Sequence, residues 1–162
     1  MNFRTDASMP LLLDDPLLIE HVLNLLDSYR YWTGMDLISQ EGSPEQRVKA
    51  LFKVKFAVLS HGTQEDPILN YGNQTALELW EMTWDEFTSI PSRLTAEPVN
   101  REERARFLAQ VTHNGFIDTY RGVRISRSGR RFLIEQATVW NILDANGRSA
   151  GQAATFSHWT YL

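Results

Sequence analysis

The chain contains no cysteine among its 162 residues. Without a thiol it has no disulfide framework, no thiolate zinc site, and no cysteine to act as a nucleophile or form a photo-adduct. A long hydrophobic run is also missing, because the apolar stretch at residues 10–13 is followed by two aspartates. That stretch is too short for the core of a signal peptide, and nothing approaches a membrane span. We therefore expect a cytoplasmic protein with no membrane partner.

Positive charge is in short supply as well. Lys and Arg total 16 against 20 Asp and Glu, which gives a formal net charge of -4. Broad nucleic-acid binding needs an excess of Lys and Arg to displace counterions from phosphates, so we expect no direct contact with nucleic acid. Hydrophobic residues make up 43% and charged residues 22%, as in globular domains. The length favours one domain with an appendage.

Two helices are predicted in the N-terminal third. Asp-Pro at residues 15–16 is typical of a helix start, and apolar residues then recur at helical spacing over residues 18–29. A second, short helix begins after Ser43, where Gln46 completes a capping box. The broad apolar face of the first helix must cover either the domain's own sheet or a second copy of the chain.

From residue 56 the sequence changes to short strands, turns and helices. The pattern predicts five strands, over residues 56–59, 68–71, 116–126, 131–143 and 148–159. Between the second and third strands, caps and stops predict helices over residues 75–81, from 83 to about 90, and from 100 to 114. Asn146-Gly147 is the strongest hairpin signal. We predict an α+β fold: a five-stranded antiparallel sheet with short helices on one face, plus an N-terminal helical extension.

This order of elements resembles the PAS fold, in which an Asn at the end of the second strand leads into the first helix, here Asn73. More narrowly, the segments "LNYGNQTALELWEMTWDEFTSIPSRLTAEP", "YRGVRISRSGRRF" and "GQAATF" are similar to the MEKHLA family. Its members are PAS-like domains, found as small stand-alone bacterial and algal proteins and at the C-terminus of plant homeodomain-leucine zipper regulators. The chain resembles the stand-alone, bacterial type.

The resemblance divides the chain into an extension over residues 1–51 and a PAS-like domain over residues 52–162. It implies sensing, ligand binding or control of association. It implies no reaction, and we expect no enzyme activity.

In a PAS fold the curved sheet forms one wall of a pocket and the short helices form its lid. The aromatic and large apolar residues placed on the two walls by the resemblance are Trp80, Met82, Trp84, Phe87 and Phe107 from the helices and Tyr120, Trp140 and Phe156 from the strands. An aromatic cavity with a few polar groups is how small ligands are usually held. The alternative is that these side chains simply fill the core.

Strand alternation bears on that choice. It places five residues of one strand on a single face, namely Phe132, Ile134, Gln136, Thr138 and Trp140, and it places Gln152 on the same face as Phe156. If these faces point inward, the three polar side chains need partners from the protein, water or a ligand, because a buried unpaired amide costs on the order of 1–3 kcal/mol. If they point outward, water satisfies them.

Two groups of arginines are further candidates. Arg93 lies in the proline-bounded loop "PSRLTAEP" beside the expected pocket mouth, where it would clamp a carboxylate or phosphate. Alternatively, Arg93 and Glu97 pair with each other or with backbone carbonyls to hold the loop. The arginines near the next hairpin are interpreted as a solvated basic face, with an acidic partner as the alternative; they are Arg121, Arg124, Arg127, Arg130 and Arg131.

No cofactor is identified. Flavin photochemistry of the light-oxygen-voltage type needs a cysteine and is excluded, whereas a non-covalent flavin or another aromatic ligand stays open. His113 lies where haem-binding PAS proteins place an axial histidine, but a histidine before Asn-Gly is more often an exposed cap residue. The remaining histidines have no metal-site spacing.

Three functional hypotheses follow. The first is a sensor that binds a small aromatic or apolar molecule between sheet and helices. The second is a ligand-free interaction module that forms a homodimer through the N-terminal helix and the outer face of the sheet. The third and weakest is a small acid-base enzyme, which would require Asp118 to be buried beside Tyr120 and His113.

Overall fold

The computed structural model describes residues 13–162. Its helices are α2 (Pro16–Thr33), α3 (Pro44–Lys53), α4 (Gln74–Trp80), α5 (Trp84–Phe87), the 3-10 turn η1 (Ser92–Thr95) and α6 (Pro98–Asn114). Its strands are β1 (Ala57–His61), β2 (Leu69–Gly72), β3 (Phe116–Ile125), β4 (Arg131–Leu143), β5 (Ser149–Phe156) and β6 (His158–Tyr161).

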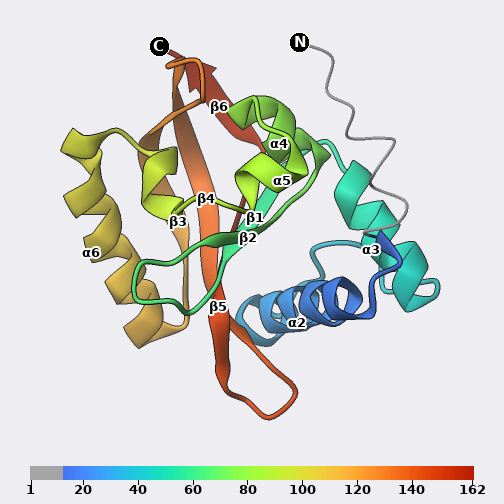
Figure 1. The fold of residues 1–162 in the computed structure, drawn as a ribbon. Coiled ribbons are helices and arrows are strands. Elements are labelled where there is room, and N and C mark those ends of the chain that lie inside the picture. Colours follow the sequence, from blue (N-terminus) through green and yellow to red (C-terminus); the bar gives the residue numbers. More distant parts are fainter. Residues whose placement is uncertain (1–12) are drawn as a thin grey trace.

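The strands form one antiparallel sheet in the order β2-β1-β5-β4-β3, with β6 paired to the first part of β4 (Figure 1). The last predicted strand is bent at Ser157, and β6 continues the register of β5 along β4. The predicted α+β fold, an antiparallel sheet with short helices, is confirmed.

Helices cover both faces of this sheet. Helices α4, α5 and α6 lie over one face, and α2 and α3 lie over the other (Figure 1). The indole nitrogen of Trp140 on β4 donates to the carbonyl oxygen of Leu25 on α2 at 3.1 Å, and the Trp140 ring meets Tyr29 edge-on at 4.9 Å. The apolar face of α2 therefore packs on the chain's own sheet, which was the first of the two alternatives.

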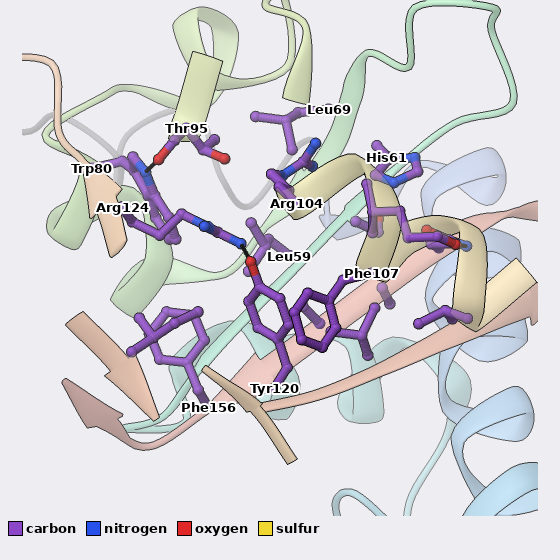
Figure 2. Close-up of a pocket in the computed structure, with 18 residues that line it drawn as sticks. Leu59, His61, Leu69, Trp80, Thr95, Arg104, Phe107, Tyr120, Arg124 and Phe156 are labelled. Carbon is purple, nitrogen blue, oxygen red and sulfur yellow. Dashed lines mark hydrogen bonds between the residues drawn. The ribbon is translucent and has the colours of Figure 1, made fainter. Parts of the chain in front are cut away.

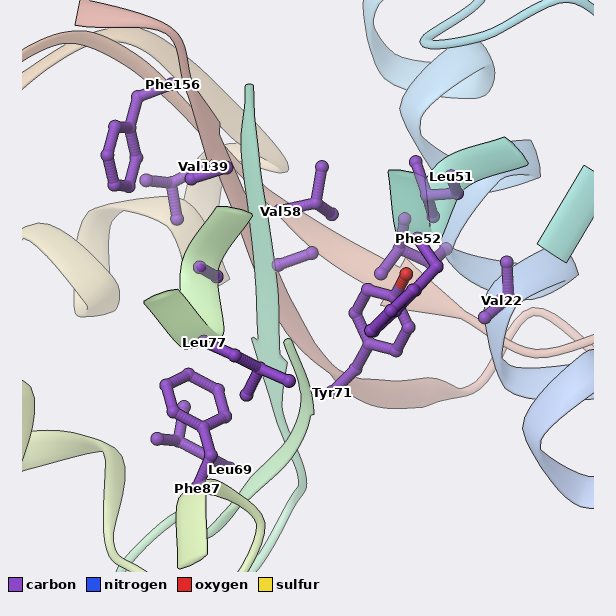
Figure 3. Packing of buried hydrophobic residues seen from close by; sticks show 14 of the residues in the cluster. Val22, Leu51, Phe52, Val58, Leu69, Tyr71, Leu77, Phe87, Val139 and Phe156 are labelled. Atoms are coloured by element: carbon purple, nitrogen blue, oxygen red, sulfur yellow. The ribbon is translucent and has the colours of Figure 1, made fainter. Parts of the chain in front are cut away.

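Buried hydrophobic side chains fill both layers and form one continuous cluster. Figure 3 shows Val22, Leu51, Phe52 and Tyr71 together on the side of α2 and α3, and Leu77 and Phe87 on the other side of β1. Helices α2 and α3 thus share a core with the sheet. The division of the chain at residues 51 and 52 stays a prediction.

Most of the predicted helix starts are confirmed. Asp15 accepts a hydrogen bond from the N–H of Leu17 at 2.9 Å, and capping boxes start α3 at Ser43 and α5 at Thr83. Helix α6 differs, because it begins at Pro98, two residues before the predicted start. Proline suits the first turn of a helix, since its fixed φ is helical and its missing N–H is not needed there.

The corner between β2 and α4 is built around Asn73, which is fully buried. Its side-chain oxygen accepts from the N–H groups of Val58 at 3.0 Å and Ala76 at 3.1 Å. Its amide donates to the carbonyl oxygens of Phe56 at 2.8 Å and Leu51 at 3.3 Å. One side chain therefore connects α3, the start of β1 and the first turn of α4.

A bulge in β4 reverses the alternation of its side chains. Tyr120 pairs with Ala137 and Gly122 with Ile134, so Glu135 and Gln136 lie opposite one residue of β3. The extra residue is absorbed at Gln136, whose φ of 51° is left-handed. The inward face therefore changes phase along the strand, and the prediction of one continuous face from residue 132 to 140 is wrong.

Candidate functional site

A cavity of about 50 Å³ lies between the sheet and α6 (Figure 2). Five of the side chains proposed from the sequence line it: Trp80, Phe107, Tyr120, Gln152 and Phe156. Phe107 meets the Tyr120 ring edge-on at 4.7 Å. Gln152 and Phe156 both line the cavity, so their shared face of β5 points inward, which was one of the two alternatives.

Several of the other proposed residues are buried away from the cavity. Trp84 meets Tyr71 edge-on at 5.6 Å, and Phe87 lies 6.1 Å from the Trp80 ring, so both fill the core, and Met82 packs against the same core. For these three side chains the alternative of simple core packing holds.

The residues proposed on β4 do not reach the cavity either. Because of the bulge, Trp140 faces α2 on the opposite side of the sheet, and Gln136 is exposed to solvent. Thr138 is half-buried and lies outside the cavity lining. Val139 and Ile134 supply this wall in their place.

The proline-bounded loop is held by contacts other than those predicted. Arg93 is exposed and pairs with Asp66 at 3.2 Å, and Glu97 pairs with Arg131. Arg93 and Glu97 hold the loop against neighbouring elements and do not pair with each other. Arg93 lies outside the cavity.

Arg124 is a polar group of the cavity that the sequence reading placed in solvent. Its side chain is only 7% exposed, and Nη2 donates to the Tyr120 hydroxyl, with the guanidinium carbon 5.1 Å from the ring centroid (Figure 2). Tyr120, Gly122 and Arg124 alternate along β3, so they share its inner face. That spacing was the signal that could have found Arg124.

Arg104 is the second basic group, and the sequence reading did not propose it. It projects from α6 into the cavity, and its Nη2 donates to the Ser92 hydroxyl at 2.9 Å. Burial, together with the positive charge of Arg124, lowers the pKa of Arg104 to about 10. Arg104 precedes Phe107 and Val111 by three and seven residues, so helical spacing places all three on one face.

His61 and Gln152 pair across β1 and β5 at one end of the cavity. His61 places Nδ1 2.9 Å from the carbonyl oxygen of Gly62, while its buried Nε2 has no hydrogen-bond partner. Burial lowers the pKa of His61. The side-chain amide of Gln152 donates to two groups of α6, the carbonyl oxygen of Leu108 at 3.0 Å and the hydroxyl oxygen of Thr112 at 2.9 Å.

A wider, more open hollow of about 530 Å³ adjoins this end of the cavity. The two share His61, Leu108 and Gln152, so these three side chains form the partition between them.

The arrangement required for acid-base catalysis is not formed. Asp118 and His113 are both exposed, and neither lines the cavity with Tyr120. Over residues 13–162 no group of His, Asp and Glu is placed to hold a metal ion. Within the same range, no helix has the length and apolar character to cross a membrane.

The sheet order and the helix-covered cavity define the class of protein, a PAS-like fold. The structure is similar to the PAS domain of a protein from Colwellia psychrerythraea, with a TM-score of 0.62 at 18% identity over 73% of this chain and 95% of that one. A second similar structure is the light-state dimer of the fungal blue-light photoreceptor Vivid, with a TM-score of 0.55 at 11% identity over 83% and 89% of the two chains. The chain belongs to the MEKHLA domain family, whose model matches residues 19–161.

The curated relatives are much longer plant proteins. The chain is 29% identical over 140 residues to homeobox-leucine zipper protein ATHB-9 of Arabidopsis thaliana, and 26% identical over 137 residues to homeobox-leucine zipper protein HOX10 of Oryza sativa subsp. indica. Each match covers 83% of this chain, but only 17% and 16% of the respective relative. The family match includes most of α2 and all of α3.

Proposed function

We propose that the chain is a sensory or regulatory module that takes up a small molecule in the cavity between the sheet and α6. The observation that carries this proposal is the polar lining of an otherwise apolar cavity. Arg104, Arg124 and His61 all line it, and the buried Nε2 of His61 has no hydrogen-bond partner. Buried polar groups without partners are costly, and a bound molecule would supply the partners.

The size of the cavity limits what it accepts without rearrangement. At about 50 Å³ it is well below the roughly 300–1,000 Å³ of pockets that hold drug-sized ligands. This favours a small molecule over a flavin.

A homodimer is the second proposed role, and it is supported by the photoreceptor dimer among the similar structures. Because the apolar face of α2 covers its own sheet, a second copy would have to use other residues. The exposed large hydrophobic side chains at the two ends of that region are Leu17, Tyr31 and Met35. The stand-alone bacterial type, the cytoplasmic location and the absence of direct nucleic-acid contact stay predictions.

Native mass spectrometry and an absorption spectrum of freshly purified protein test ligand uptake. Ala154 lines the cavity, so Ala154→Leu should fill it and abolish binding of the molecule found in the native protein. Ala105→Leu places the same side chain on the exposed side of α6 and should leave binding unchanged. The proposal fails if the purified protein carries no molecule and if, in addition, no compound of a fragment mixture binds to the native protein more tightly than to Ala154→Leu.

A further inference from the structure

Two guanidinium groups share the cavity without a counter-charge. No Asp or Glu lines the cavity within the described part of the chain, and neither Arg104 nor Arg124 has a carboxylate within ion-pair distance there. Other arginines of the chain do find carboxylates, namely Arg30, Arg93, Arg127 and Arg131. The cavity therefore holds two positive charges that no carboxylate of the described residues balances.

Both guanidinium groups keep donors that the protein does not use. A guanidinium carries five N–H donors. Arg104 donates to the Ser92 hydroxyl, and Arg124 donates to the Tyr120 hydroxyl and the carbonyl oxygen of Val123. The remaining donors are free to bind an acceptor in the cavity, and a carboxylate offers two oxygens in a geometry that matches the planar guanidinium.

Figure 2 shows the two arginines reaching into the cavity from different elements, Arg104 from α6 and Arg124 from β3, with the Tyr120 hydroxyl at the end of the Arg124 side chain. Aliphatic and aromatic side chains supply most of the remaining wall, including Leu69, Phe107 and Val139. The cavity thus combines a cationic side with an apolar body.

A third, independent observation comes from His61. Its ring is only 9% exposed and lines the same cavity, and its buried Nε2 has no partner. Since Nδ1 faces a carbonyl oxygen and must donate to it, Nε2 of the neutral ring is an acceptor. A water or a hydroxyl group of a bound molecule would satisfy it.

We propose that the cavity binds a small monocarboxylate, with its carboxylate between Arg104 and Arg124 and its short apolar chain against the wall formed by Leu69, Phe107 and Val139. This inference rests on the proposed function and names the chemical class of the molecule taken up. The carboxylate would balance the two enclosed charges and accept from their free N–H groups. The small volume restricts the chain to a few carbons.

Butyrate is the probe, and butyramide is its neutral counterpart of nearly the same shape. Binding to the full chain is measured by calorimetry and by the rise in unfolding temperature at saturating probe. We expect butyrate to bind and butyramide to bind at least about tenfold more weakly, since a charge-assisted hydrogen bond is lost. Arg104→Gln and Arg124→Gln should each weaken butyrate binding by a similar factor.

Matched variants remove an arginine from the same elements outside the cavity. Arg106→Gln on α6 and Arg121→Gln on β3 remove exposed arginines and should leave butyrate binding within about twofold. Arg104→Lys keeps the charge but loses the planar fork, so its affinity should fall between those of the native protein and Arg104→Gln. This series also remains informative if Arg124→Gln does not fold.

The outcomes separate this inference from the proposed function. If butyramide binds as tightly as butyrate and Ala154→Leu abolishes binding of both, the cavity takes up small molecules without selecting a carboxylate. In that case the monocarboxylate inference is overturned and the proposed function stands. If butyrate binds equally well to Arg104→Gln and Arg106→Gln, its site lies elsewhere and the inference is also overturned. If neither probe nor any fragment binds in the cavity, both proposals fail together.

Discussion

At the scale of single residues, Asn73 explains the strand-to-helix corner in "LNYGNQTALELW". Its carboxamide makes four hydrogen bonds to backbone groups of α3, β1 and α4 and is sealed from water. The corner is therefore a structural joint that sets how α4 lies over the sheet, and so positions Trp80 at the cavity.

Asn73→Ala should lower the free energy of unfolding by about 2–4 kcal/mol, because it removes a helix cap and leaves buried backbone groups without partners. Ser43→Ala is the control, since it removes the cap of the more exposed α3 and should cost about 1 kcal/mol. Urea unfolding measures both values. Equal losses would show that the bonds beyond the cap contribute nothing.

His21 gives the protein a pH dependence. His21 lies on α2, and its Nε2 is 2.9 Å from the hydroxyl oxygen of Ser60 on β1. Burial lowers the pKa of His21 below the usual 6.5, although a hydrogen bond with Asn70 opposes the shift. Between the lowered value and 6.5 the unfolded chain binds more protons than the folded one. The contribution to stability is thus present above pH 6.5 and is lost as the pH falls toward the lowered value.

Urea unfolding above and below pH 6.5 should show this loss, and His21→Gln should reduce the difference between the two conditions. His158→Gln, at an exposed position on β6, should leave the difference unchanged. A pH dependence of equal size in all three proteins would assign the effect to other groups.

At the scale of elements, the bulge in β4 decides which side chains reach the cavity. It turns Gln136 to solvent and Trp140 toward α2, and it brings Val139 to the inner face. No residue in the sequence marks this position, since a glycine would be expected at a left-handed φ and a glutamine occupies it. Plain alternation therefore fails here.

Gln136→Gly should raise the free energy of unfolding by up to about 1 kcal/mol, and Gln136→Val should lower it by roughly 1–2 kcal/mol, because a left-handed φ strains residues with a Cβ and most of all branched ones. Glu135→Gly is the control, since it places glycine at the neighbouring exposed position and should destabilise the chain. Equal effects of the two glycines in urea unfolding would exclude strain at Gln136.

Helix α2 belongs to the same folding unit as the sheet it covers. Leu25 is fully buried, so Leu25→Ala should cost about 2–5 kcal/mol. Because the contact is within one chain, the loss should be the same at all protein concentrations. Leu17→Ala, at a position 75% exposed, should change the unfolding free energy by no more than about 0.5 kcal/mol. A loss that depends on concentration would place α2 across a dimer.

At the scale of the whole molecule, the sequence was sufficient for the order of elements, most of the helix caps and the PAS-like fold. These features depend on local signals such as Ser43, Thr83 and the Asn146-Gly147 turn. The composition of the cavity depends on which face each strand presents after a bulge, and on how closely α6 approaches β3. Because of such tertiary details, Arg104 was not proposed, Arg124 was assigned to a solvated face, and Trp140 was assigned to the wrong side of the sheet.

The central claim is that the space between the sheet and α6 is a ligand site. A crystal structure of the full chain grown with butyrate tests it most directly. We expect electron density for the carboxylate between the guanidinium groups of Arg104 and Arg124, with its apolar chain toward Leu69 and Phe107. A cavity that holds only water, or that side chains close, at a concentration well above any measured dissociation constant would contradict the account.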